Sequence, residues 1–156
     1  MTFIDRQQLG LPTVHIIDAE ADSVGHYRQW SARPGRFFVV RADDRLVERD
    51  GKEQKCSAIR EELRTNNAFV KTRDVLYHGR AATQWTAEVA VRLTRPAQRN
   101  RPSANDRQRI SGPPVALRLI IAEVRDSQNK TLAVWYLLSN VPPDVDTDTI
   151  ALWYYW

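Results

Sequence analysis

The sequence predicts a mixed α+β fold, with a strand, a helix and a strand near its start and a larger antiparallel sheet after them. Two short apolar runs, residues 14–17 and 37–42, flank a segment whose apolar residues recur at helical spacing, and this is the pattern of a βαβ-like unit. From residue 68 onward, strand-like segments follow one another without strong helices between them, which indicates an antiparallel meander. With 156 residues, 42% of them hydrophobic, the chain is long enough for one domain with a real core.

The first predicted strand, Val14 to Ile17, ends at Asp18. A rigid scaffold can hold an acidic group over a pocket at the end of a buried strand. A carboxylate directly after four largely apolar residues is costly to bury unless a metal or a cation compensates it. We therefore identify Asp18 as the best candidate for chemistry.

Two more acids follow at alternate positions, Glu20 and Asp22. Asp22 precedes the predicted helix at 22–32 and fits an N-cap, because its carboxylate can accept from free backbone amides. Glu20 fits a solvated loop residue near the same helix start. For these two acids a structural role is favoured over chemistry.

The second predicted strand, Phe37 to Ala42, follows a Pro-Gly turn and carries Arg41 near its end. By its chemistry Arg41 can pair with a carboxylate such as Asp43 or Asp18, and it can equally bind a phosphate. The residues themselves leave these roles open.

The region from Leu46 to Asn67 changes character. Its first part has an Asp50-Gly51 turn between two short strands, which predicts a hairpin. Its second part predicts a short amphipathic helix with Ile59 and Leu63 facing inward and its charges on a solvated face.

Four strands are predicted in the β-rich part, each bounded by Gly, Pro or Asn: FVKTRDVLYHG, TQWTAEVAVRLTRP, VALRLIIAEVRD and TLAVWYLLSN. A basic, turn-rich segment at 97–114 separates the second from the third. It is either a flexible surface loop or an arm that meets phosphates through Arg99, Arg101, Arg107 and Arg109.

Two aromatic features complete the chain. Trp135 lies within the fourth of these strands, where a tryptophan is most often part of the core. After two prolines, Asp146 or Thr147 is a plausible N-cap for a last helix that ends in an apolar LWYYW segment. Such side chains need neighbours to bury them.

The composition narrows the function classes without naming one. Lys and Arg number 23 against 19 acids, which gives a formal charge of +4 and a pI near 9.5 and permits an anionic partner. The single cysteine, Cys56, excludes an internal disulfide framework and fits a reducing cytosol, and the three histidines lack zinc-ligand spacing. No apolar run has the length of a membrane span and the first residues lack the pattern of a signal peptide, so we expect a soluble, cytoplasmic protein.

Five stretches carry a more specific signal: HIIDAEADSVGHYRQW, RFFVVRADDR, YHGRAATQW, LAVWYLLSNVP and IALWYYW. Together they closely resemble the DDE transposases of bacterial insertion sequences, in the branch whose second catalytic aspartate opens a DREAD-like motif. The similarity runs from about Thr13 to Trp156. It implies an α/β fragment of a ribonuclease-H-like core at 1–45, a large antiparallel β-rich insertion at 46–142, and the start of a truncated core helix at 143–156.

The resemblance also implies roles for four residues. Asp18 matches the second catalytic aspartate, which is a ligand of Mg²⁺ in the complete enzyme. Arg41 matches an arginine that faces the transposon end, and Trp135 matches a tryptophan that stacks on a base flipped from that end. Tyr154 best matches a DNA-binding tyrosine of the last helix, with Tyr155 one step away.

The chain departs from the family pattern in ways that bear on activity. Ala19 stands where the DREAD-like motif has arginine, which removes a salt-bridge or phosphate partner and suggests relaxed selection. The first aspartate is expected upstream of Met1, and the arginine, glutamate and lysine that follow the tyrosine are absent. One carboxylate does not make a two-metal site. The resemblance thus implies a truncated transposase, inactive alone, whose partner is transposon-end DNA and whose complete form allows a homodimer.

Two other functions stay open. One is a β-rich nucleic-acid-binding module without catalysis that uses Arg41, the basic segment and Trp135. The other is a metal-dependent hydrolase built on Asp18, Glu20 and Asp22, which is weaker because a strand-to-helix turn points these side chains apart.

Overall fold

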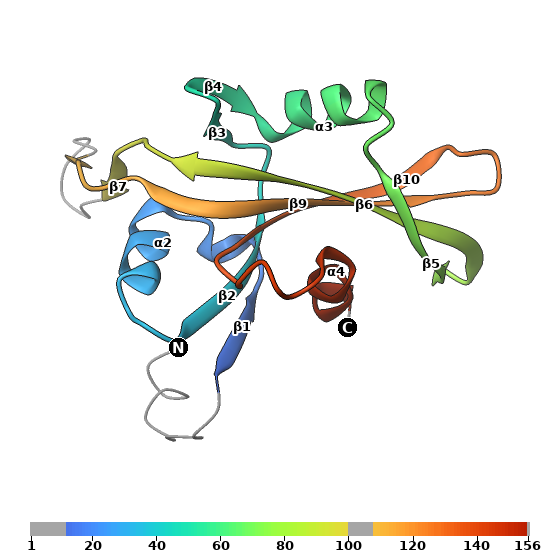
Figure 1. Ribbon diagram of the computed structural model, residues 1–156, viewed down its shortest axis with the longest axis horizontal. Coiled ribbons are helices and arrows are strands. Elements are labelled where there is room, and N and C mark those ends of the chain that lie inside the picture. The colour runs from blue at the N-terminus through green and yellow to red at the C-terminus, as the bar shows by residue number, and fades with distance from the viewer. Residues whose placement is uncertain (1–11, 100–107, 156) are drawn as a thin grey trace.

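The computed structural model describes residues 12–99 and 108–155, and a mixed eight-stranded sheet forms its centre (Figure 1). Seven strands lie in the order β1-β2-β10-β9-β6-β3-β4, and β5 pairs with β6 beside this path. The strands of this sheet are β1 Thr13–Ile17, β2 Arg36–Ala42, β3 Leu46–Arg49, β4 Lys52–Lys55, β5 Val70–Tyr77, β6 Arg80–Leu93, β9 Val115–Arg125 and β10 Thr131–Ser139. The short strands β7 Ala97–Arg99 and β8 Gln108–Ile110 form a separate antiparallel pair.

Three α-helices cover the two faces of the sheet, and the alternation of apolar residues along the strands explains why both faces are covered. The helices are α2 Val24–Ser31, α3 Cys56–Thr65 and α4 Thr147–Tyr155. Successive strand residues point to opposite faces. Phe38 and Val40 join α2 and α3 in one apolar cluster, whereas Val39 between them joins α4 in the other. Figure 1 shows α3 and α4 on opposite sides of the long β6 and β9 ribbon.

The unit at the start of the chain is a parallel pair, as predicted. β1 and β2 pair in parallel through α2, and their register sets Ile17 opposite Val40. The residues that follow these two, Asp18 and Arg41, therefore come side by side where β1 ends. The predicted meander is confirmed as well, because β5, β6, β9 and β10 pair in turn and antiparallel.

One smaller prediction is confirmed and another is only partly right. The Asp50-Gly51 hairpin is confirmed, since both residues have positive φ, 51° and 74°, as a two-residue hairpin turn of this kind requires. The charges of α3 are only partly solvated, because Arg60 pairs with the fully buried Glu123.

The prediction of Asp22 as the helix N-cap is wrong. Ser23 occupies that position without a side-chain cap bond, while Asp22 accepts from the Tyr27 hydroxyl at 2.9 Å and pairs with Arg45. A cationic partner in the tertiary structure competes successfully with the free amides of the helix start.

The strands of the expected partial core pack on the rest of the chain. β2 pairs with β10 over Val39 to Ala42, so the sheet runs without a break from the expected partial core into the expected insertion. α4 from the third segment packs on the same sheet through Ile150 and Ala151. The division into three segments, which expresses a relation to a family, stays a prediction.

Candidate nucleic-acid interface

Asp18 lies at the end of β1 and is held by three donors. Its Oδ1 accepts from the backbone amide of Ala19 at 2.7 Å, which starts the 3-10 turn Ala19–Ala21. Arg41 Nε lies 2.8 Å from the same oxygen, and the Tyr154 hydroxyl donates to it at 3.2 Å. The Asp18 side chain is nevertheless 63% exposed, so the cluster faces solvent and is open to a ligand.

The three donors keep this carboxyl group ionised. The backbone hydrogen bond from Ala19 is the largest effect, and together with the charge of Arg41 and the hydroxyl of Tyr154 it holds the pKa of Asp18 below its ordinary value, against the opposing effect of desolvation. Conversely, partial burial and the neighbouring Asp18 carboxylate raise the pKa of Tyr154, so its hydroxyl stays protonated and donates. The cluster therefore combines a fixed anion, an arginine and a hydroxyl donor on one small area.

Tyr154 reaches Asp18 across 136 residues of sequence because α4 is fastened to the sheet at its start. Arg118 of β9 binds both oxygens of Glu88 of β6 at 2.7 Å, and the Thr147 hydroxyl donates to the same carboxylate. Arg118 also donates to the Pro142 carbonyl at 2.7 Å. These bonds fix the first turn of α4 to the sheet. The last turn of the helix then brings Tyr154 to Asp18, just after the end of β1.

A pocket of about 240 Å³ opens next to this cluster. Four aromatic side chains line it, Tyr77, Trp135, Tyr154 and Tyr155, together with Gln84 and small aliphatic residues. Tyr77 and Trp135 meet edge to face, with ring centroids 6.4 Å apart. Trp135 is half-buried, so part of its ring is available to a ligand. Tyr154 borders both the pocket and Asp18. It therefore connects Asp18 and Arg41 on one side with Trp135 on the other, so these four candidate residues share one surface.

The other two acids of the first stretch do not join this surface. Asp22 accepts from Tyr27, from the Asp43 amide and from Arg45, and Glu20 is exposed. Within residues 12–99 and 108–155, no group of three His, Cys, Asp or Glu side chains is placed to hold a metal ion. Asp18 belongs to no such group in that part of the chain, so these residues alone do not fit a two-ion site.

Part of the basic segment falls outside the described residues, namely Arg101 and Arg107, and the side chain of Arg99 does too. Arg109 on β8 is exposed. Arg28 of α2 donates to the backbone carbonyls of Arg95, Ile110, Gly112 and Pro113 at 2.9 to 3.1 Å. This arginine clamps both ends of the basic segment to α2, so their position relative to the sheet is defined.

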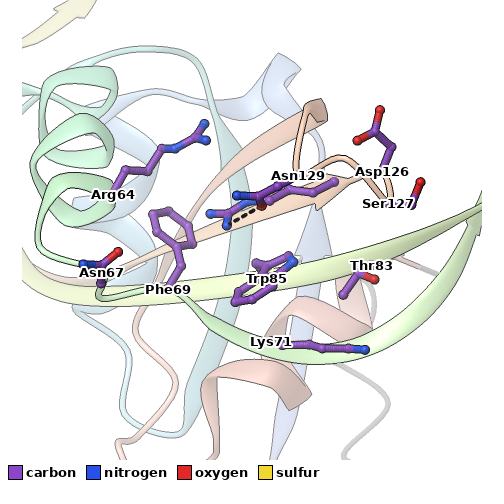
Figure 2. Close-up of a pocket in the computed structure, with 10 residues that line it drawn as sticks. Arg64, Asn67, Phe69, Lys71, Thr83, Trp85, Asp126, Ser127 and Asn129 are labelled. Atoms are coloured by element: carbon purple, nitrogen blue, oxygen red, sulfur yellow. Dashed lines mark hydrogen bonds between the residues drawn. The ribbon is translucent and has the colours of Figure 1, made fainter.

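A second, larger pocket of about 540 Å³ lies on the α3 face of the sheet (Figure 2). Its walls include Phe69, Trp85 and Arg125, whose guanidinium lies 5.0 Å and 4.7 Å from the two ring centroids. Figure 2 shows Arg64 reaching over this pocket from α3. Beneath it the fully buried Glu123 binds Arg60 and Arg125. A buried carboxylate paired with two guanidinium groups is the pattern of a structural network.

Sequence reasoning missed Gln84, Tyr77 and Glu123. A polar residue in the middle of a strand-like run was the only local signal for Gln84 and Glu123. Which face each polar residue occupies depends on the neighbouring strands, and a single run does not show it.

No helix among the described residues is long and apolar enough to cross a membrane. Comparison of the chain with protein-family models finds no match, and neither does comparison with curated proteins.

Proposed function

We propose that this chain is part of a DDE transposase of an insertion sequence and that its Asp18 surface binds the end of the transposon DNA. One observation carries the proposal: Asp18, Arg41 and Tyr154 meet within 3.2 Å beside a pocket that contains Trp135. The resemblance assigns a catalytic role to Asp18 and DNA-binding roles to Arg41, Trp135 and Tyr154, and these residues come from separate elements. Chance would not be expected to bring them to one surface.

The geometry supports different roles for the residues of this surface in binding DNA. Arg41 is 40% exposed and paired with a solvent-facing carboxylate, so it can turn one of its remaining N–H groups to a DNA phosphate. Trp135 and the tyrosines around it offer flat faces on which an unpaired base stacks. The exposed Arg109 adds positive charge for the duplex beyond the end.

The parallel pair of β1 and β2 with α2 between them supports the further proposal of a partial ribonuclease-H-like core. Asp18 then belongs to the set of acids that holds Mg²⁺ in the complete family enzyme. Because the described residues do not form a two-ion site, we propose binding without strand cleavage by this chain alone. Its proposed place of action is the cytoplasm, and its complete form is proposed to work as a homodimer.

The test is a binding titration by fluorescence anisotropy with a duplex of about 30 base pairs that ends in a short unpaired flap, over a salt series. We expect affinity to fall as salt rises. Arg41→Ala is expected to weaken binding about fivefold and to lower the salt slope by about one. The control Arg33→Ala removes an exposed arginine before the opposite end of β2, and we expect it to bind within about twofold of the unaltered chain.

Trp135→Ala is expected to weaken binding to the flapped duplex about tenfold and to leave binding to the blunt duplex nearly unchanged, because only an unpaired base can stack. The proposal would be contradicted if the unaltered chain, Arg41→Ala and Trp135→Ala all bound the flapped duplex with one affinity and all bound the blunt duplex with one affinity.

The absence of a two-ion donor set among the described residues favours a second candidate, a nucleic-acid-binding module that is unrelated to transposases. Both candidates predict the same binding surface. Inverted repeats that flank the coding sequence, or nearby sequence that encodes the family's arginine and glutamate, support the transposase. An intact unrelated operon supports the module. Mg²⁺-dependent nicking that is lost in Asp18→Ala contradicts the non-catalytic module, and it also contradicts the proposal that this chain alone does not cleave DNA.

A further inference from the structure

Gln84 places a buried amide in the wall of the aromatic pocket. It lies on β6, is 1% exposed and lines the pocket beside Trp135 and Tyr154. Its Nε2 has no hydrogen-bond partner among the described residues. A buried amide without a partner has lost its hydration without compensation, so such a group in a native protein needs an explanation, and a bound ligand supplies one.

The orientation of this amide follows from its neighbour Arg73. Arginine carries only donors, so the Gln84 atom that faces it is the oxygen. Arg73 Nε and Nη2 donate to Gln84 Oε1 at 3.1 Å and 2.7 Å. Arg73 is itself held against the Tyr155 ring, with its guanidinium 5.2 Å from the centroid. The carbonyl side of the amide is therefore occupied, and the NH₂ group is the part of Gln84 that has no partner among the described residues.

Two of the pocket's hydroxyl groups are already used. The Tyr154 hydroxyl donates to Asp18, and the Tyr155 hydroxyl donates to the Leu76 carbonyl at 2.7 Å. Their rings face the pocket while their polar atoms bind elsewhere. The pocket thus presents flat aromatic surface, and its wall includes Gln84, whose side-chain donor is unpaired within the described part of the chain.

We propose that Gln84 reads the edge of a nucleobase held in this pocket by donating from Nε2 to an acceptor oxygen of the base. The inference rests on the proposed function, because it assumes that Trp135 and its neighbours hold an unpaired base of a DNA end. Stacking tolerates every base, whereas a donor with a fixed direction selects a base that presents an acceptor there. Gln84 is accordingly the specificity-determining residue of the pocket, and Arg73 is the residue that positions it.

The test uses the full chain and two matched probes. Each is a duplex of about 20 base pairs with one unpaired residue at its end. In one probe this residue is thymine, which offers two carbonyl oxygens. In the other it is difluorotoluene, which has the shape of thymine and is a very poor acceptor. We expect the unaltered chain to bind the thymine probe about fivefold to tenfold more tightly than the isostere.

Gln84→Glu keeps an acceptor for Arg73 and removes the donor. We expect the ratio of the two dissociation constants to fall to about one in this variant, since the lost hydrogen bond is the source of the discrimination. The matched control Gln29→Glu makes the same chemical change on the exposed face of α2 and is expected to keep the ratio of the unaltered chain. A direct readout on the unaltered chain is the side-chain amide resonance of Gln84, which we expect to shift with the thymine probe and not with the isostere.

The outcomes separate the two proposals. If Trp135→Ala weakens both probes, but the unaltered chain binds thymine and its isostere alike or the Gln84 resonance does not move, the role of Gln84 is overturned and the DNA-end proposal stands. If Gln84→Glu still binds the thymine probe more tightly than the isostere, the role of Gln84 is likewise overturned and the DNA-end proposal stands. If Trp135→Ala binds both probes as the unaltered chain does, the proposed function itself fails.

Discussion

Asp18 and Asp22 are chemically identical residues only four positions apart, but their surroundings suit them to different roles. Asp18 is 63% exposed and faces an arginine and a tyrosine that are themselves partly open to solvent. The side chain of Asp22 is 6% exposed and satisfies an internal set of donors from Tyr27, Arg45 and the Asp43 amide. An open carboxylate with a cation is suited to exchange partners with a ligand, whereas a closed one is suited to hold the fold.

Replacing Asp22 by alanine should therefore destabilise the protein. The change leaves the Arg45 guanidinium without its counter-charge and the Tyr27 hydroxyl without its acceptor. We expect the free energy of unfolding to fall by about 3 kcal/mol, measured by chemical denaturation. The control Glu20→Ala alters an exposed acid two residues away and is expected to change it by less than about 0.5 kcal/mol. Equal, small effects of both variants would show that the Asp22 pair contributes nothing.

At the scale of elements, the first turn of α4 decides whether the interface exists. Residues of α4 reach Asp18 and the aromatic pocket only while the helix stays fastened to the sheet. The fastening is the bidentate pair of Glu88 and Arg118, with Thr147 as a third member. The two charged side chains are 26% and 13% exposed, so solvent screens the pair less than it screens a surface pair.

Glu88→Gln should weaken this fastening in a pH-dependent way. Hydrogen bonds from Arg118 and Thr147 and the charge of Arg118 hold the pKa of Glu88 below its ordinary value of 4.5, against the opposing effect of burial. Its stabilising contribution is therefore present above that value and is lost as the pH falls through the lower value of the folded state. We expect the variant to lose about 1.5 kcal/mol of unfolding free energy at about pH 7, and the difference from the unaltered chain to shrink at about pH 3.

The matched control for this experiment is Glu53→Gln. Arg95 binds the Glu53 carboxylate in the same bidentate way, at 2.9 Å for both bonds, but the two side chains are 43% and 53% exposed. We expect almost no change in its unfolding free energy. A loss in Glu88→Gln that does not depend on pH would contradict the assignment to the ionised carboxylate.

At the scale of the whole molecule, one buried carboxylate connects the α3 layer to the sheet. Glu123 of β9 is fully buried and binds Arg60 of α3 and Arg125 of its own strand. Arg125 continues the network to Asn129 in the turn before β10, and its guanidinium lies 5.0 Å and 4.7 Å from the ring centroids of Phe69 and Trp85. Both rings line the larger pocket (Figure 2). The network connects segments that are far apart in the sequence, so we expect its loss to lower the free energy of unfolding of the whole protein.

Glu123→Gln is expected to lower the global free energy of unfolding by about 3 kcal/mol, because it leaves two guanidinium groups with a neutral partner in the interior. Thermal and chemical denaturation followed by both circular dichroism and tryptophan fluorescence would measure it. The control Glu61→Gln removes a 65% exposed partner of Arg60 and is expected to change stability by less than about 0.5 kcal/mol. A change confined to one probe would mean that Glu123 stabilises only the α3 region.

The sequence by itself determined the elements of this protein and their kind. Apolar periodicity marked β1, α2, β2, α3 and the four long strands, because the period of a helix or a strand is set by residues close in the chain. The position of Asp18 after an apolar strand marked it as a candidate, and the resemblance to DDE transposases added Arg41, Trp135 and Tyr154. The burial of Ile59 and Leu63 on the inner face of α3 followed from the same local pattern.

Only the tertiary structure decided which of these residues meet. The parallel register of β1 and β2 sets Asp18 beside Arg41, and the sheet order, with α4 packed across it, carries Tyr154 to both. It also decided that Asp22 pairs inward and that Gln84 faces the aromatic pocket while its neighbour Trp85 faces α3. Register and strand order depend on how distant segments compete to bury their apolar faces, and no local stretch of sequence contains that information.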